Sequence, residues 1–307
     1  MANVTNIPFR LVCREGGADL TFTEMISSHA IARENSQTVK MARVLAGESP
    51  CAVQIMGPDA KSVTAAIKEL EALRETGQTY PDFYDINLGC PSKNILRSKS
   101  GAYLLQSPKT IEEIVSAAVA ASAIPISCKA RLGLKSEKAG EVAMAVEKGG
   151  AGMLTMHGRT ASQGYSGRAK WATVKKAVDA CGIYVLCNGD IKNGADAKAA
   201  LEQSGAAGVM IGRRAIENPM VFHECKKGMA GWDKAQAAPA GMSKNAMFAK
   251  YAGYAKEYGM IDISYARIFA TELTRGVKGG AGLRREMNKC GTMECLAGII
   301  SGLAAPQ

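Results

Sequence analysis

Two cations near the end of an apolar segment are the first residues that could act on a ligand. Lys129 and Arg131 alternate with Cys128 and Ala130, so both side chains leave an extended segment in the same direction. An unpaired charge that faces a closed interior is costly. The two cations therefore indicate an anionic or electron-rich ligand, and a structural ion pair with Glu24 is the alternative.

A thiol follows another apolar segment. Cys90 comes directly after Gly89 and before Pro91, which places it on a loop and not within a strand or helix. Most single cysteines are inert core fillers, and no adjacent base is evident that would make this one a nucleophile. Since an ordinary thiol is mostly protonated near neutral pH, Cys90 is suited to general-acid catalysis.

Neighbouring segments add hydrogen-bonding groups and two glycine turns. His157, in H-G-R-T, is expected at the level of these two cations, one strand further on, and Gln54 could contact the edge of a heteroaromatic ring. In V-L-C-N-G-D-I and V-M-I-G-R-R-A, Gly189 and Gly212 each open a helix after an apolar run, and Arg213 adds a cation. Paired turns of this kind in the last two units predict a phosphate site.

Seven apolar runs are expected to be the strands that position these groups. They are Asp19–Met25, Cys51–Gly57, Phe83–Cys90, Pro125–Arg131, Gly152–His157, Ile183–Asn188 and Gly208–Arg213. Helix-length segments separate them, which indicates parallel βαβ units, and polar residues at many strand ends are typical of a (β/α)8 TIM barrel. A Rossmann sheet is the poorer interpretation, because no G-x-G-x-x-G motif follows a strand.

The barrel is expected to lack its first strand. An amphipathic helix over Ile7–Gly16 precedes the first run, and Met1–Asn6 is too short for a strand with its loop. The reading frame is therefore expected to start late, or the chain to be a fragment. We predict seven regular strands with a gap between the first and the last, an arrangement that leaves unpaired edges of the kind proteins avoid.

Length and composition narrow the class of protein. The 307 residues fit a barrel of about 250 residues with a small extra domain. The sequence has no long apolar run and no signal-peptide core, so a cytoplasmic protein with no membrane contact is expected. We also expect a monomer. The nine cysteines are expected to be reduced and no metal is expected, although Cys290 and Cys295 could be half of a metal site.

The net charge of +10 favours a polyanionic partner, because each neutralised phosphate adds affinity; a generally basic surface is the alternative. Residues 221–307 hold 12 Lys and Arg against 7 Asp and Glu. We assign residues 1–222 to the barrel and 223–307 to a helical domain with helices over 243–258, 263–275 and 284–296, after a linker or frayed helix that ends near residue 240.

Two surfaces of the helical domain could meet a nucleic acid. One is a stripe at helical spacing formed by Met247, Tyr251, Tyr254 and Tyr258. We expect it in the core of the domain, and base stacking is the alternative. The other is a basic cluster of Arg275, Lys278, Arg284, Arg285 and Lys289, which is either a solvated face or a phosphate contact.

Whole motifs of the barrel resemble those of the tRNA-dihydrouridine synthases, from Met1 to about Phe222. M-A-N-V-T-N-I-P-F-R resembles the family's M-A-G-V-T-D-x-P-F-R, and F-T-E-M resembles Y-T-E-M. A-V-Q, D-I-N-L-G-C-P, C-K-A-R-L-G and M-H-G-R-T-A-S-Q-G-Y-S-G resemble A-V-Q, D-I-N-x-G-C-P, V-K-x-R-L-G and V-H-G-R-T-x-x-Q-x-Y-x-G. N-G-D-I and G-V-M-I-G-R match as well, whereas the C-terminal helices match only loosely.

The resemblance implies an FMN enzyme that reduces selected uridines of tRNA to 5,6-dihydrouridine, with NADPH or NADH as reductant. It implies that Cys90 protonates ring carbon 5 of uracil, that hydride from the flavin reaches ring carbon 6, and that Asn87 and Arg131 orient the uracil. The implied cofactor-binding residues are Met1, Gln54, Lys129, His157, Asn188, Gly189, Asp190, Gly212 and Arg213. Arg284 and Arg285 would grip tRNA phosphates while the target base is flipped out.

The chain departs from the family's pattern in three places. The strand before M-A-G-V-T is absent, which implies an incomplete flavin seat. Asn3 and Asn6 replace a Gly and an Asp, and Arg214 and Glu217 replace small residues. Two other functions stay open: a small-molecule flavin barrel of the dihydroorotate dehydrogenase type, and a tRNA-binding module that has lost catalysis.

Overall fold

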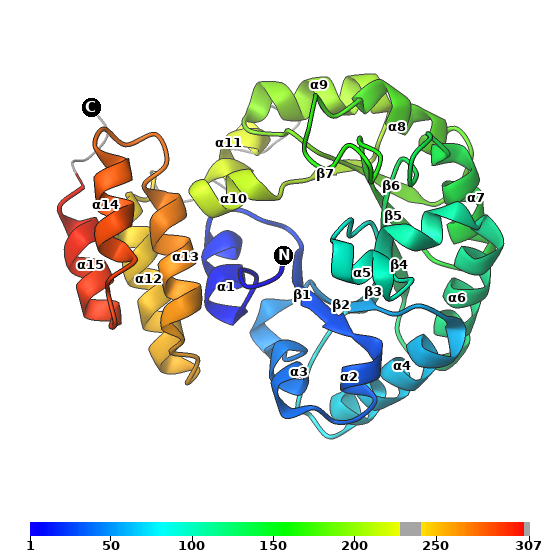
Figure 1. Ribbon diagram of the computed structural model, residues 1–307, viewed down its shortest axis with the longest axis horizontal. Coiled ribbons are helices and arrows are strands. Elements are labelled where there is room, and N and C mark those ends of the chain that lie inside the picture. The colour runs from blue at the N-terminus through cyan, green and yellow to red at the C-terminus, as the bar shows by residue number, and fades with distance from the viewer. Residues whose placement is uncertain (228–240, 304–307) are drawn as a thin grey trace.

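The computed structural model describes residues 1–227 and 241–303. Its centre is a sheet of seven parallel strands that are hydrogen-bonded in chain order, with helices around the outside (Figure 1). The strands are β1 (Thr21–Ser27), β2 (Cys51–Met56), β3 (Phe83–Leu88), β4 (Ile126–Arg131), β5 (Met153–His157), β6 (Tyr184–Asn188) and β7 (Gly208–Met210). Six of the seven predicted runs contain one strand each, and the first run overlaps β1, which continues two residues beyond it.

Helices alternate with the strands. Those of the barrel region are α1 (Ile7–Glu15), α2 (Ser28–Ile31), α3 (Ser36–Met41), α4 (Ala60–Glu75), α5 (Lys93–Arg97), α6 (Pro108–Ala121), α7 (Ala139–Lys148), α8 (Trp171–Val178), α9 (Gly194–Ser204), α10 (Arg213–Glu217) and α11 (Val221–Lys227), with 3-10 turns η1 (Ala46–Glu48) and η2 (Gly101–Gln106). The C-terminal region holds α12 (Lys244–Glu257), α13 (Ile263–Leu273), α14 (Gly280–Met287) and α15 (Met293–Ser301).

The ring of strands is open on one side. Within the described residues the sheet begins at β1 and ends at β7, which do not pair with each other, and residues 1–6 form turns and no strand. The N-terminus lies at this opening (Figure 1). The predicted seven-stranded α/β barrel with a gap between its first and last strands is therefore confirmed.

Helix α1 stands at the opening, and local residues specify its ends. The Asn6 side chain accepts a hydrogen bond from Phe9 N (3.2 Å), and Pro8 occupies the first turn, where a missing N–H is harmless. A Cβ on Gly16 would lie 2.2 Å from the carbonyl oxygen of Pro219, so only glycine fits where the helix ends. The predicted helix over residues 7–16 is confirmed.

The four C-terminal helices form a bundle that docks against α1 (Figure 1). Met247 and Tyr251 on α12 are 3% and 1% exposed. Asn6 Nδ2 donates to Tyr251 Oη (3.0 Å), and the Tyr254 hydroxyl donates to the Glu15 carboxylate. The first half of the stripe therefore packs between the bundle and the barrel, as expected for core residues, whereas Tyr254 and Tyr258 are only half-buried.

Two expectations for the bundle are wrong. The helix expected over 284–296 is divided into α14 and α15, because Thr292 caps a new helix by accepting from Cys295 N (3.2 Å). The turn brings the Cα atoms of Cys290 and Cys295 to 5.6 Å, and the two residues form a disulfide. Not all cysteines are therefore reduced. The linker or frayed helix expected between residues 219 and 240 begins with α11, which packs on α9, and its remainder lies outside the described residues.

Candidate active site

A large cavity lies at the C-terminal ends of the strands. Its volume is about 1720 Å³, and it is lined by all of the site residues predicted in the barrel: Met1, Gln54, Asn87, Cys90, Lys129, Arg131, His157, Asn188, Gly189, Asp190, Gly212 and Arg213. The cavity also reaches Leu20 and Gly208, at the start of β1 and β7. It exceeds the usual range of about 300–1,000 Å³ for ligand pockets because it continues into the gap between those two strands.

Cys90 stands at the mouth of the cavity on a loop whose main chain is held on both sides. Its thiol is free and half-buried. Cys90 N donates to Asn87 Oδ1 (2.9 Å), and Cys90 O accepts from Ala102 N (3.1 Å). Gly101, with φ of 58°, comes so close that a Cβ there would lie 3.2 Å from Cys90 Cβ. The expected loop position of Cys90 just beyond β3 is confirmed.

Arg131 ties this loop to the one that follows β5. Its Nε donates to Gly89 O (3.0 Å), and its Nη1 donates to Thr160 O (2.9 Å) and Gly164 O (2.8 Å). The residue is 3% exposed, and burial lowers the pKa of its guanidinium. Arg131 therefore shapes the wall beside Cys90, in addition to any contact with a ligand.

Lys129 points from β4 toward β6. Its Nζ donates to Asn188 Oδ1 (3.3 Å), and Asn188 Nδ2 donates to Met210 O (2.7 Å). Burial lowers the pKa of Lys129 to about 8, with Asp85 acting to raise it and Arg131 to lower it. The amine is thus mostly cationic at neutral pH, and Asn188 fixes where its charge lies.

His157, at the end of β5, is a neutral ring. Burial lowers its pKa to about 2, and the cations Lys129, Arg131 and Arg159 add to the effect. Its Nε2 lies 3.4 Å from Arg159 Nη1. A neutral imidazole can donate through one nitrogen and accept through the other, so His157 can hydrogen-bond a polar ring without adding charge.

The turn after β6 requires glycine. Gly189 has φ of 115°, and a Cβ there would lie 2.7 Å from His157 Cδ2 and 2.8 Å from Ala169 Cβ. Its carbonyl accepts from Trp171 Nε1 (2.8 Å). The close fit holds the backbone of this turn against the cavity, where its N–H groups can approach an anion.

Asp190 organises the same turn. Its carboxylate accepts from Arg159 Nη2 (2.5 Å), Ala169 N (2.8 Å) and Arg213 Nη2 (3.2 Å). Burial alone would raise the pKa of Asp190, but the bonds from Arg159 and Ala169 lower it. The Arg213 guanidinium also lies over the Tyr165 ring, 4.4 Å from its centroid. The carboxylate therefore positions cations around the turn.

Gln54 and Asn87 are joined beneath Cys90. Asn87 Nδ2 donates to Gln54 Oε1 (2.8 Å), and Gln54 Nε2 donates to Asp85 Oδ2 (2.8 Å). Register pairs Gln54 with Asp85 across β2 and β3, and Asn87 with Lys129 across β3 and β4. Gln54 and Asn87, which were both predicted to contact a ligand, thus belong to one row of hydrogen-bonded side chains.

The alternative of an ion pair with Glu24 is wrong. Glu24 Oε2 accepts from Asn3 N (2.5 Å), and its Oε1 accepts from Tyr265 Oη (2.7 Å). Within the part of the chain that the structure describes, no ion pair joins Glu24 to Lys129 or Arg131. The two cations are therefore left facing the cavity.

The other residues that depart from the family's motifs also have structural partners. Asn6 caps α1 and bonds to Tyr251, and Arg214 Nη1 forms an ion pair with Glu217 (3.1 Å). These substitutions serve the packing of α1 and α10. In α14, Arg284 Nη1 donates to Thr274 Oγ1 (3.2 Å), and Arg285 is exposed.

Several residues that shape the site were missed by sequence reasoning. Asp85 shares the inward face of β3 with Asn87, and the alternation in D-I-N was the available signal. Arg159 stands two residues after His157, in the same motif. Tyr165 is the tyrosine of that same motif, whereas Trp171, at the start of α8, offers no such signal.

Two classes of feature are absent from residues 1–227 and 241–303. None of their helices is long and apolar enough to cross a membrane. No group of three or more His, Cys, Asp and Glu side chains there could hold a metal ion.

Comparison with known proteins assigns the family. A family profile described as dihydrouridine synthase matches residues 1–299. The chain is 36% identical over 234 residues to a probable tRNA-dihydrouridine synthase of Aquifex aeolicus, covering 74% of this chain and 71% of that protein. It is 37% identical over 227 residues to tRNA-dihydrouridine synthase B of Pseudomonas putida, covering 73% and 65%.

The chain therefore belongs to the dihydrouridine synthase family, and it is an oxidoreductase of that family. The match runs through the barrel and most of the helical bundle.

Proposed function

We propose that this protein reduces uridines in tRNA to 5,6-dihydrouridine with a bound FMN, which NADPH or NADH reduces. The observation that carries the proposal is the free Cys90 thiol at the mouth of a cavity whose wall holds the cationic Lys129 and the neutral His157. A proton donor opposite a hydrogen-bonding wall suits the reduction of a polar ring between them.

The far wall of the cavity suits a flavin phosphate. Gly189 turns its backbone to the cavity, and the nearest atom to a Cβ built on Gly212 is Met1 Sδ at 3.8 Å. Arg213 adds a cation to these two turns. In this proposal the residues that would hold the flavin ring are Met1, Gln54, Lys129 and His157, and those that would hold its phosphate are Asn188, Gly189, Asp190, Gly212 and Arg213. Asp190 takes part through its backbone, since both of its carboxylate oxygens are engaged.

The chain's own residues supply the other half of the reduction. Reduced FMN, when bound, supplies the hydride that adds to ring carbon 6 of the uracil. Cys90 Sγ donates the proton that ring carbon 5 requires, and the resulting thiolate regains a proton from water. Asn87 and Arg131 hold the uracil beside the thiol, and Lys129 stabilises negative charge on the reacting rings.

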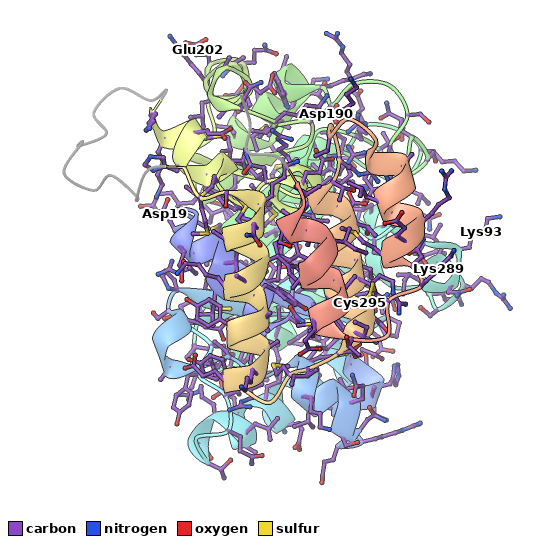
Figure 2. The ribbon with its side chains drawn as sticks, turned by 90° about the vertical axis from the view of Figure 1, so that its left-hand side faces the viewer. Asp19, Lys93, Asp190, Glu202, Lys289 and Cys295 are labelled. Atoms are coloured by element: carbon purple, nitrogen blue, oxygen red, sulfur yellow. A yellow bond between two sulfur atoms is a disulfide. The ribbon has the colours of Figure 1, made fainter. Side chains whose placement is uncertain are left out.

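Basic residues of both domains support a polyanionic substrate. Lys93, on the segment that follows Cys90, and Lys289, in the bundle, project on the same side of the molecule in Figure 2. Asp19, which precedes β1, lies on the opposite side. A tRNA that places one base in the cavity can therefore reach cations of the bundle, Arg284 and Arg285 among them, with its phosphates.

The test compares tRNA that lacks the modification with free uracil and dihydroorotate as substrates. We expect the purified protein to show a flavin absorbance spectrum, and to form dihydrouridine, detected by mass spectrometry, only in tRNA. Cys90→Ala should keep the flavin and its reduction by NADPH but lose uridine reduction by about 10²–10⁴-fold. Cys181→Ala, which removes a half-buried thiol outside the cavity, is the matched control.

Three results would contradict the proposal. Dihydrouridine formation by Cys90→Ala at the rate of the control would remove Cys90 from the chemistry. Turnover of dihydroorotate but not of tRNA would favour a small-molecule flavin barrel. A protein that binds tRNA but no flavin would be a binding module.

A further inference from the structure

A buried carboxylate lies beneath the proposed site, outside the cavity lining. Asp85, on β3, is 0% exposed, and within the described residues it forms no ion pair. Its oxygens accept from Ser127 Oγ (2.5 Å) and Gln54 Nε2 (2.8 Å). Burial raises the pKa of Asp85 to about 6, although both bonds act to lower it. Since an apolar residue at this position would avoid that cost, the carboxylate calls for a functional reason.

A directional row of hydrogen bonds begins at Asp85 and ends at Cys90. An ionised carboxylate only accepts, so Gln54 must turn its NH2 group toward Asp85 and its carbonyl toward Asn87. Asn87 must then present its NH2 group to Gln54. This leaves Asn87 Oδ1 free to accept from Gly89 N (3.1 Å) and Cys90 N (2.9 Å).

The row bears on the thiol because it holds the backbone N–H of Cys90, while Arg131 Nε holds the carbonyl of the preceding Gly89. Ala102 N and the close approach of Gly101 fix Cys90 from the side of η2. The backbone N–H of Cys90 donates to the side chain of Asn87. The side-chain amide of Asn87 is held in turn by its hydrogen bond to Gln54. A proton donor displaced by about 1 Å can lose about 10²-fold in rate.

We propose that Asp85 is a positioning residue for Cys90, which anchors the amides of Gln54 and Asn87 and thereby holds the thiol in place. The inference rests on the proposed function only in taking Cys90 as the proton donor. Asp85 itself touches neither substrate nor cofactor in this arrangement.

The experiment compares Asp85→Ala with Asp85→Asn. The alanine removes the acceptor from Gln54. The asparagine keeps it, because its Oδ1 can face Gln54 while its Nδ2 faces Ser127 Oγ. Thr155→Ala is the matched control, since Thr155 is a buried polar residue of β5 whose hydroxyl has no hydrogen-bond partner among the described residues.

Two measurements are made on each variant. The first is the rate of alkylation of Cys90 by iodoacetamide, in a Cys181→Ser background and without flavin or tRNA. We expect Asp85→Ala to react several-fold faster than the parent, and Asp85→Asn and Thr155→Ala to match it. The second is turnover, where Asp85→Ala should lose about 10²-fold in kcat with unchanged KM for tRNA, and Asp85→Asn should restore the rate.

Parental alkylation in Asp85→Ala would overturn the inference, and so would an asparagine variant as impaired as the alanine one. Should Asp85→Ala fail to fold, Gln54→Met breaks the same row at its middle, and the same rise in alkylation is expected. Alkylation needs no substrate. A protein without tRNA activity would therefore refute the proposed function while the row from Asp85 to Cys90 is still tested.

Discussion

The guanidinium of Arg131 should matter for stability as much as for catalysis, and Arg131→Met separates the two roles. The substitution removes three hydrogen bonds to the carbonyls of Gly89, Thr160 and Gly164 and keeps most of the side-chain volume. Bonds from a charged donor contribute about 1.5–3 kcal/mol each, or roughly 4–9 kcal/mol together. The substitution also removes the cost of desolvating a charge at a 3% exposed site, and this offsets several kcal/mol of the loss. The expected net loss is about 2–4 kcal/mol.

The assay is urea denaturation of flavin-free Arg131→Met, with Arg168→Met as the control. Arg168 is exposed on the loop after β5, so its replacement makes the same change of charge without the three bonds. Arg131→Met should unfold with a free energy lower by the amount given, and Arg168→Met should differ from the parent by less than about 0.5 kcal/mol. Equal stabilities would refute the structural role and leave Arg131 as a ligand contact alone.

Three further outcomes are expected. Because burial lowers the pKa of Lys129 to about 8, affinity for FMN should fall as the pH rises from about 7 to 9, and Lys129→Met should bind FMN more weakly and lose this dependence. The folded pKa of Asp85, about 6, lies above its value of 3.8 in the unfolded chain, so the cost of the carboxylate to stability grows as the pH rises from about 4 to 6 and stays constant above that. Asp85→Asn should therefore raise the free energy of unfolding by about 2–3 kcal/mol at about pH 8, with the gain vanishing below about pH 4. Neutralising Arg284 and Arg285 should weaken tRNA binding and reduce its salt dependence by up to about one phosphate contact each.

Each of these has a decisive comparison. A Lys129→Met protein that retained FMN and showed the parental pH dependence of FMN affinity would contradict the role of the amine. If the difference in free energy of unfolding between Asp85→Asn and the parent stayed the same from acidic to basic pH, the carboxyl would not be desolvated. For the arginines, Lys175→Gln with Lys198→Gln on the outer helices α8 and α9 is the charge-matched control. An equal change in the salt dependence of tRNA binding in both double variants would show that Arg284 and Arg285 belong to a solvated face and do not contact phosphates.

The functional side chains at the strand ends were predictable because successive side chains of a strand point to opposite faces. Alternation around Lys129 and Arg131 put both side chains on the inner face, and the register of β4 with β5 places Arg131 beside His157 as expected. The same alternation would have found Asp85. The position of Cys90 was predictable because Gly89 and Pro91 end the strand. The gap between β1 and β7 followed from the number of apolar runs.

Helix ends in the bundle were harder, because local propensity is weak there. An apolar pattern runs through residues 284–296, and only the cap at Thr292 and the pairing of Cys290 with Cys295 divide it. Cysteine spacing alone could not tell a disulfide from two thiols, since the outcome depends on a distance between Cα atoms.

The sequence by itself determined the strand order, the inward side chains and the family, because these depend on residues close together in the chain. The partners of those side chains were decided by the tertiary structure. Glu24 was an open candidate to pair with the cations, but it bonds to Tyr265, which is 241 residues away in the chain. Arg131 bonds to carbonyls of two loops that lie 42 and 33 residues away in the chain. Such contacts join distant segments, and only the closed packing of strands, loops and bundle brings their atoms within hydrogen-bonding distance.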